Sequence, residues 1–323
     1  MSVGLPYMGS KRKLSGRILD HILEHNPNCE YFYDLFGGGG SISFEALRRN
    51  RFKKVLYNEL NTGVVSLLKK IRDDGITKEF YQWVDKDTFN KHKFDDDWFG
   101  GLVKVCWSFG NKGVTYLYGR GVEDYKKNFH LVVVDGLDKL DEMMEFCERC
   151  VFEKYGIKQD CNLVMPQSVS FYDRRLEIRH QLIAFERLCK SNQIKGLENL
   201  KQLQNLKQLE HLERLQNLDK PTITNLSYEQ VEIDTPIEKT IIYCDIPYIG
   251  TAEYQCGGFN HEGFYDWVKK SDYRIYVSSY ESNLFEVESY RHLSTLSATN
   301  NQKVTEEKLF CNQIYKKSVD LFG

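Results

Sequence analysis

Apolar and polar residues along the first seventy positions predict short strands and amphipathic helices in turn. Residues 31–36 form an aromatic run that predicts a strand, four glycines follow, and helical spacing of apolar residues resumes over 42–50. A second strand is predicted over 55–57 and a second helix over 61–72. This order is a βαβ unit, in which the sheet is parallel and ligand sites lie beyond the carboxyl ends of the strands.

The same alternation returns in the last third of the chain. Residues 240–244 are almost continuously apolar, as expected of a strand that is buried on both faces. A helix is predicted over 266–270, a strand over 274–278, and a last strand over 308–314 that closes the sheet. Together the two parts predict an α/β fold.

Residues 196–218 contain a leucine repeat with a period of three, from Leu197 to Leu218. Successive leucines on an α-helix would shift by about 60° and spread around its axis, so a single amphipathic helix is not expected. Short solenoid-like coils or a mobile repeat remain as alternatives. We expect a structural or partner-binding insertion without chemistry of its own.

Composition places the chain among ordinary soluble proteins. The 323 residues are 41% hydrophobic and 28% charged, which excludes collagen, coiled-coil rods and wholesale disorder. We find neither an apolar run long enough to cross a membrane nor a secretory signal, so a cytoplasmic location is expected. Nine cysteines include one C-x-x-C, Cys147 and Cys150, for which reduced thiols are favoured over a metal site.

The four glycines at 37–40 lie between a predicted strand and a predicted helix, where a ligand can approach the backbone closely. Neither the P-loop pattern nor the G-x-G-x-x-G register is present. Glu59 follows the next strand, and a carboxylate there is suited to the ribose hydroxyls of a nucleoside ligand. The alternative is a plain surface glutamate.

Residues 104–130 interleave aromatic and basic side chains on a glycine-rich frame. Such a segment suits a surface that grips phosphates and stacks on bases. A loop packed by its own tyrosines is an equal alternative.

Asp245, Ile246, Pro247 and Tyr248 follow the buried strand directly. The carboxylate and the backbone carbonyl of Ile246 can accept the two protons of a planar amine, while Tyr248 stacks on its ring. A cis-proline turn would explain Pro247, but not a charged residue after four apolar or aromatic ones.

The order of four segments resembles the DNA adenine N6-methyltransferases of the Dam type. They are residues 6–11 (Pro-Tyr-Met-Gly-Ser-Lys), 34–41, 57–61 and 243–248. The resemblance implies a Rossmann-like S-adenosylmethionine-dependent methyltransferase fold with a smaller target-recognition insertion. Its implied domains are a catalytic domain over 1–75 and 222–323, a DNA-binding region over 76–190, and the leucine-repeat insertion over 196–218.

The resemblance also assigns roles to residues. The positions implied for S-adenosylmethionine are Tyr7, Lys11, Asp34, Phe36, Gly37, Gly39, Glu59 and Asp245. The catalytic positions implied are Asp245, Ile246, Pro247 and Tyr248. The family's usual motif is Asp-Pro-Pro-Tyr, and Ile246 departs from it. Because the acceptor there is a backbone carbonyl, the departure is expected to be mild.

The implied reaction needs neither a metal nor a covalent intermediate. An adenine is flipped out of double-stranded DNA, and its N6 amine attacks the sulfonium methyl group in line. Asn111, Lys112, Tyr118 and Arg120 are predicted as DNA contacts. The recognition sequence, a restriction endonuclease partner and the oligomeric state stay open.

Two other functions remain to be weighed. A cytosine-N4 DNA methyltransferase uses nearly the same acceptor geometry, but its motif more often begins with Ser than with Asp. A catalytically silent DNA- or S-adenosylmethionine-binding protein would explain Ile246 as decay of the motif.

The net charge of −2 is unevenly distributed, which bears on DNA binding. Residues 1–72 carry 12 basic and 6 acidic side chains, and residues 104–131 carry 5 and 2. We therefore expect one basic face with salt-dependent affinity for DNA.

Overall fold

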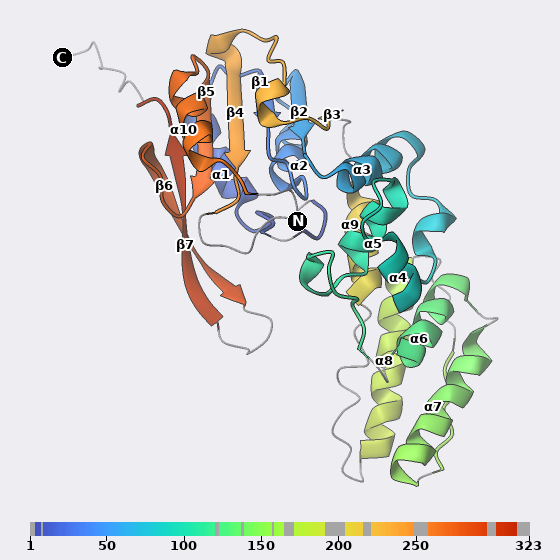
Figure 1. Ribbon diagram of the computed structural model, residues 1–323. Helices are drawn as coiled ribbons and strands as arrows, with labels where there is room; N and C mark the ends of the chain where they lie inside the picture. The colour runs from blue at the N-terminus through green and yellow to red at the C-terminus, as the bar shows by residue number, and fades with distance from the viewer. Residues whose placement is uncertain are drawn as a thin grey trace. The chain divides into compact units, whose positions relative to one another are not determined.

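The computed structural model describes most of the chain (Figure 1). The described residues are 4–7, 9–119, 123–136, 139–156, 158–164, 171–190, 204–215, 221–248, 258–295 and 302–314. The chain folds into two compact units. The first contains Met1–Gly75, Asp95–Leu102 and Arg214–Gly323, and the second contains Ile76–Phe94 and Val103–Glu213.

Strands of the first unit form one sheet, with seven strands among the described residues. They are β1 (Tyr31–Asp34), β2 (Lys54–Asn58), β3 (Thr222–Thr224), β4 (Thr240–Asp245), β5 (Arg274–Ser279), β6 (Phe285–Thr295) and β7 (Gln302–Cys311). The spatial order is β3-β2-β1-β4-β5-β7-β6, in which β1 to β5 are parallel and β7 and β6 are antiparallel to their neighbours. The strand order switches between β1 and β4: β2 and β3 follow on one side of β1, and the later strands follow on the other side, beyond β4. Doubly wound sheets bind their ligands at such a switch point.

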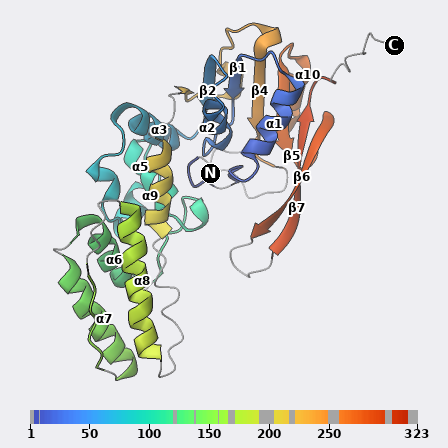
Figure 2. The same cartoon turned by 180° about the vertical axis from the view of Figure 1, so that it is seen from behind.

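Helices cover both faces of this sheet. They are α1 (Ser15–His25), α2 (Ser41–Arg48), α3 (Thr62–Asp74) and α10 (His261–Lys270). Figure 1 has α10 in front of the sheet, whereas the reverse view in Figure 2 has α1 in front. The predicted α/β fold is confirmed.

The apolar run of β4 packs into the hydrophobic cores on both faces of the sheet. Ile241 and Tyr243 pack on the side of α1 and α2, while Ile242 and Cys244 pack on the side of α10 with Phe264. Because successive side chains of a strand point to opposite faces, a strand covered on both sides is apolar throughout. This packing fixes Asp245 at the carboxyl end of β4, beside the point where the strand order switches.

The second unit is helical in its described part. It contains two short 3₁₀ helices, η1 (Lys78–Tyr81) and η2 (Phe109–Asn111). Its α-helices are α4 (Lys86–His92), the end of α5 (Trp98–Cys106), α6 (Glu123–Asp135), α7 (Leu140–Tyr155), α8 (Phe171–Lys190) and most of α9 (Gln204–Leu215). Ser108 and Tyr116 form an isolated antiparallel bridge, which closes a turn over residues 108–116.

The leucine repeat contains a regular helix, so the expectation against a single helix is wrong for α9. Leu206, Leu209 and Leu212 are fully buried although they lie on different sides of the helix. Lys207 and Arg214 are its exposed positions, and a spacing of seven puts them on one narrow stripe. A helix enclosed on its other sides buries leucines at a period of three, so the described part of the repeat packs as a core helix. Residues 197–203 and 216–218 of the repeat lie outside the described residues.

Two further observations concern the expected absences. No helix in the described part of the chain is long and apolar enough to span a membrane. Within the same residues, no three His, Cys, Asp or Glu side chains are grouped so as to hold a metal ion. Cys147 is a buried free thiol and Cys150 a half-buried one.

Candidate active site

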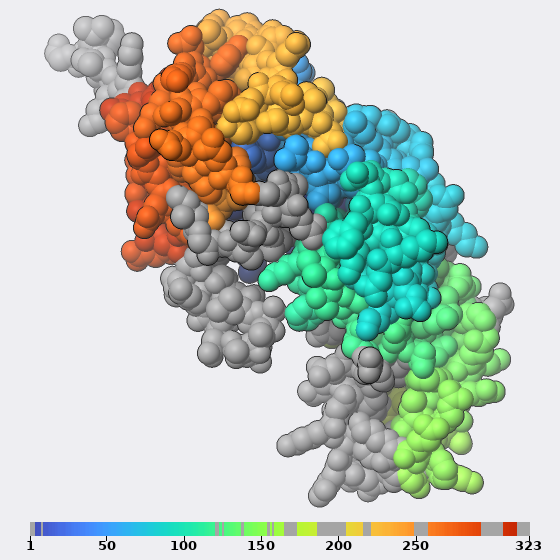
Figure 3. Space-filling view, in the orientation of Figure 1, coloured from blue at the N-terminus to red at the C-terminus, as the bar shows by residue number. Residues whose placement is uncertain are grey.

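A cavity of about 250 Å³ opens at the carboxyl ends of β1, β2 and β4. Its lining includes Tyr7, Lys11, Asp34, Phe36, Gly37, Gly39, Glu59, Asp245 and Pro247. In Figure 3 the blue atoms of the first strands lie next to the amber surface of residues 221–248. Segments that are distant in sequence thus meet at the cavity, and the lining residues that the structure describes all belong to the first unit.

The glycine turn after β1 is held against β2. The Gly37 N–H donates to the Asn58 carbonyl at 2.7 Å, and the Tyr57 hydroxyl donates to the Gly38 carbonyl at 2.7 Å. A Cβ on Gly37 would lie 2.2 Å from the Tyr57 ring, and one on Gly39 would lie 2.8 Å from the Leu5 carbonyl oxygen. The turn requires glycine at these positions because neighbouring chain segments already occupy the space.

Glu59 fastens this turn to the start of α3. One of its carboxylate oxygens accepts the Gly38 N–H and the other accepts the Asn61 N–H, each at 2.8 Å. A carboxylate has about four acceptor positions, so these bonds leave capacity for ribose hydroxyls. Glu59 is therefore built into the pocket wall, unlike a plain surface glutamate.

Asp34 ends β1 as a buried carboxyl group. Its Oδ2 accepts the Ser43 hydroxyl at 2.7 Å, while its Oδ1 is buried without a hydrogen-bond partner among the described residues. Burial raises the pKa of Asp34 to about 7, the Ser43 hydrogen bond opposes this, and the nearby Asp245 and Glu59 carboxylates add to the rise. Oδ1 of Asp34 can therefore accept a hydrogen bond from a donor in the cavity.

Four charged or polar side chains meet beside the end of β4. Lys11 Nζ lies 2.8 Å from both carboxylate oxygens of Asp245 and 2.8 Å from Glu307 Oε1. The Tyr248 hydroxyl donates to Glu307 and lies 3.3 Å from Asp245 Oδ1. We call these residues, Lys11, Asp245, Tyr248 and Glu307, the acidic cluster.

Ionisation in the acidic cluster follows from burial and charge. Burial alone would lower the pKa of Lys11, but Asp245 and Glu307 raise it above its ordinary value, so Lys11 stays cationic. Burial raises the pKa of Asp245, Lys11 lowers it, and Glu307 raises it. Burial also raises the pKa of Tyr248, which keeps its hydroxyl protonated as a donor. With both carboxyl groups ionised, the cluster carries one surplus negative charge.

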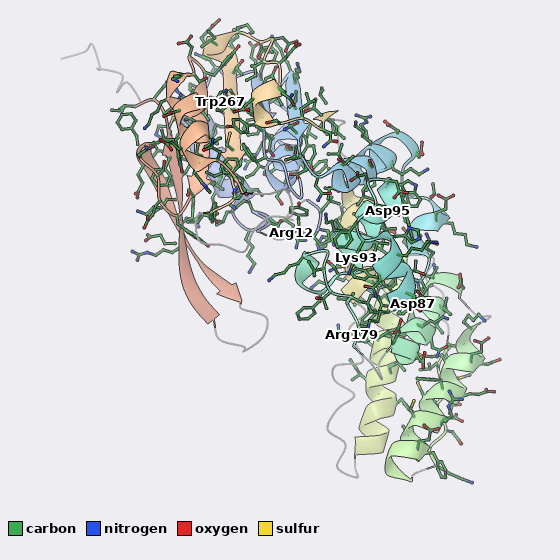
Figure 4. The ribbon with its side chains drawn as sticks, in the orientation of Figure 1. Arg12, Asp87, Lys93, Asp95, Arg179 and Trp267 are labelled. Carbon is green, nitrogen blue, oxygen red and sulfur yellow. The ribbon has the colours of Figure 1, made fainter. Side chains whose placement is uncertain are left out.

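Aromatic side chains form another wall of the cavity. Phe36 contacts Tyr228, Phe259 and Phe264, with ring centroids 5.4 to 5.6 Å apart, and Trp267 of α10 extends this group (Figure 4). Such a wall suits the flat apolar surface of a heterocyclic ligand.

Residues of the catalytic motif occupy fixed positions. Ile246 is buried in the core on the α10 side, so its side chain packs there instead of facing the cavity. The Pro247 carbonyl is hydrogen-bonded to the His261 ring at 2.8 Å, and all described peptide bonds are trans, so Pro247 forms no cis turn. The cavity therefore brings together the residues predicted to bind the cofactor and Pro247, whereas Tyr248 lies beside it in the acidic cluster and the Ile246 side chain lies in the core.

The predicted DNA contacts fall into different environments in the second unit. Lys112 is exposed, and Asn111 is half-buried with a left-handed φ of 57° and accepts a hydrogen bond from Gln208. Tyr118 is buried, stacks on Trp83 and donates to Asn205 at 2.5 Å, so it presents no open face for a base. For Tyr118 the alternative of a loop packed by its own tyrosines is the better description. Arg120 lies outside the described residues.

Glu307 was missed at the sequence level. It precedes Leu309 and Cys311 at intervals of two on β7, and both of these belong to the core. Side chains at i, i+2 and i+4 of a strand share a face, so this alternation could have indicated a carboxylate on the buried side.

A family model of the D12 class N6 adenine-specific DNA methyltransferases matches residues 7–101, which include Tyr7, Lys11, the glycine turn and Glu59. A search of the curated proteins gave no match. The family match does not favour the cytosine-N4 or the silent alternative. It implies S-adenosylmethionine as methyl donor and DNA as substrate. Residues 7–101 match the D12 class of N6 adenine-specific DNA methyltransferases, and this match supports methylation of adenine N6 in DNA as the activity of the chain.

Proposed function

We propose that the acidic cluster and the adjoining cavity form the active site at which this enzyme transfers a methyl group to adenine N6 in a specific duplex sequence. The observation that carries the proposal is the meeting of Asp245 with the cavity of the glycine turn. A charged acceptor at the end of a buried strand, beside a nucleoside-sized pocket, suits amine methylation. The narrower Dam-type assignment and a restriction endonuclease partner stay predictions.

The residues around the cavity fit S-adenosylmethionine. The glycine turn over residues 37–39 presents its backbone to the cavity as a cradle, Glu59 is suited to ribose hydroxyls, and the buried Oδ1 of Asp34 can accept a hydrogen bond from a donor such as the ligand's amino group. Tyr7 and Phe36 supply apolar surface. When bound, the cofactor supplies a sulfonium methyl group, whose bond to sulfur breaks with its electron pair remaining on sulfur.

Toward the adenine, Asp245 and the Ile246 carbonyl would each accept a hydrogen bond from the N6 amino group, which orients the nitrogen lone pair for attack. The new N–C bond leaves N6 with a positive charge, and Asp245 accepts one proton from it and passes that proton to water. Tyr248 stacks on the ring, and its hydroxyl bonds to Glu307 and Asp245 fix its orientation. Because the Ile246 side chain packs in the core, the departure from proline places no side chain in the cavity.

On the DNA side, we propose that the turn over residues 108–116 contacts the duplex. Lys112 is exposed, with the exposed apolar side chains of Phe109 and Val114 on the same turn. Lys93 (Figure 4) at the end of α4 donates to the Val114 carbonyl at 3.1 Å and supports the turn. A basic residue can bind phosphate while apolar ones contact unstacked bases.

Product analysis tests the proposed function. The full-length enzyme is incubated with labelled S-adenosylmethionine and unmethylated duplex DNA, which is then digested to nucleosides. Label in N6-methyladenine supports the proposal. Label in N4-methylcytosine, or DNA binding without label transfer, contradicts it. Direct sequencing of the methylated positions gives the recognition site.

A further inference from the structure

Glu307 lies on β7, far along the chain from every segment that resembles the methyltransferase motifs, yet it belongs to the acidic cluster. Its side chain is buried, its Oε1 lies 2.8 Å from Lys11 Nζ, and it accepts the Tyr248 hydroxyl. Apart from orienting Tyr248, it has no part in the roles described for the cofactor pocket and for adenine. A buried carboxylate is costly unless it has partners, so its position calls for a role.

We propose that Glu307 is a positioning residue for methyl transfer: it shares Lys11 with Asp245 and leaves the acidic cluster with one surplus negative charge beside the cavity. This inference rests on the proposed function. It assigns to Glu307 an action through Lys11, Tyr248 and Asp245, without contact to the adenine or to the cofactor.

The first argument is the division of the Lys11 donors. An ammonium group has three N–H bonds, but Lys11 Nζ faces four acceptor atoms: the Gly9 carbonyl oxygen at 3.3 Å, and both Asp245 oxygens and Glu307 Oε1 at 2.8 Å. Glu307 therefore competes with Asp245 for the Lys11 N–H bonds. This competition weakens the hold of Lys11 on Asp245, whose oxygens can then accept hydrogen bonds from the amine.

The second argument is charge. Lys11 paired with Asp245 alone would be neutral, whereas the second carboxylate makes the cluster net negative. Positive charge grows on N6 during the attack, and a fixed negative charge beside it stabilises that change without reorganisation. A neutral pair would give less of this stabilisation.

The third argument concerns ligand choice. Lys11 and Asp245 line the cavity directly, so the surplus charge borders the ligand. S-adenosylmethionine has one more positive charge than S-adenosylhomocysteine, because only the donor is a sulfonium. The cluster should therefore favour the donor over the product, and this preference is measurable without any reaction.

The pH dependence has a definite sign. The groups that face Asp245 are Lys11, Asp34 on β1, Tyr243 and Cys244 on β4, Tyr248, Tyr280 after β5, and Glu307 on β7. Activity requires the Asp245 carboxylate and is lost as pH falls through its pKa. Because Glu307 raises that pKa, Glu307→Gln should shift the acid limb of the kcat profile to lower pH.

The test compares wild type with Glu307→Gln, which keeps the shape and removes the charge, and with Glu306→Gln. Glu306 precedes it on β7 but is exposed and pairs with Arg291, so it is the matched control. We expect Glu307→Gln to lower kcat at least about tenfold. The acid limb should move to lower pH, and the calorimetric preference for S-adenosylmethionine over S-adenosylhomocysteine should fall. Glu306→Gln should change none of these.

A second variant keeps the test decisive if Glu307→Gln does not fold. Glu307→Asp retains the charge, so it should keep the wild-type acid limb and the wild-type ligand preference. An unchanged limb and preference in Glu307→Gln, or an altered limb and preference in Glu307→Asp, would overturn the inference. If wild type forms N6-methyladenine, either result leaves the proposed function intact, whereas absence of that product contradicts the proposed function itself.

Discussion

The two units each contain a buried polar network, and the networks differ in charge. In the first unit, Lys11, Asp245 and Glu307 place three formal charges within hydrogen-bond distance beside a cavity. In the second unit, a chain of neutral groups joins Tyr118 to Asn205 and Asn205 to His130.

The difference in charge indicates which network serves the reaction and which one stabilises the fold. Burying charges costs folding free energy even when they are paired, so a charged cluster at a pocket indicates function. A neutral network whose members bond to one another costs less and fixes a unique packing. His130 fits the second description, because burial lowers its pKa to about 4 and keeps its ring neutral.

Gly37→Ala should give the largest change in the first unit apart from loss of Asp245. The new methyl group would lie 2.2 Å from the Tyr57 ring, so the turn must move and the cofactor cradle is lost. We expect affinity for S-adenosylmethionine to fall more than about a hundredfold by calorimetry, since several hydrogen bonds depend on the turn. Gly258→Ala is the control, because Gly258 also lines the cavity and a Cβ added to it would meet no described atom within 4 Å. Equal losses in both variants would refute the steric explanation.

Leu212→Ala tests α9 as a core helix of the second unit. Removing this fully buried side chain should lower the free energy of unfolding by about 2–5 kcal/mol, measured by urea unfolding with tryptophan fluorescence. Lys207→Ala, on the exposed stripe, should change it by less than about 0.5 kcal/mol. Similar small effects for both would mean that α9 is not enclosed.

His130 gives the neutral network a pH signature. Its pKa is lower in the folded protein than in the unfolded chain, so the unfolded state binds more protons and stability is lost as pH falls below about 6.5. Between pH 7 and pH 4, wild type should lose roughly 3 kcal/mol more unfolding free energy than His130→Gln. Parallel pH dependences in the two proteins would show that His130 is not held neutral.

Gln208→Ala should have the smallest effect. It removes the 2.8 Å hydrogen bond to Asn111 on the proposed DNA-binding turn, at a cost of about 1 kcal/mol. We expect duplex affinity to fall about fivefold while S-adenosylmethionine affinity is unchanged. A double-mutant cycle with Asn111→Ala measures the coupling, and strictly additive losses would contradict a role for this bond in DNA binding.

More of the first unit than of the second could be predicted from the sequence. Its main features are local patterns: the buried run before Asp245, the glycine turn and the carboxylate after β2. Local patterns can be recognised in the sequence without knowledge of the packing. Glu307 was not identified because two consecutive glutamates look like a solvated strand until the partners of β7 are known.

The second unit was harder to predict because the burial of its residues depends on how its elements pack together. Tyr118 and Lys112 look alike as members of an aromatic and basic segment, but only Lys112 is exposed. Likewise, leucines at a period of three do not fit an amphipathic helix with one buried side. They fit α9 because neighbouring elements cover it on several sides.

The most direct test of the central claim is Asp245→Asn, which keeps the size of the side chain and removes its charge. We predict that the single-turnover rate of adenine methylation falls at least about a thousandfold, while duplex affinity and the unfolding midpoint stay close to wild type. A rate within about threefold of wild type would show that the acidic cluster is not where methyl transfer takes place.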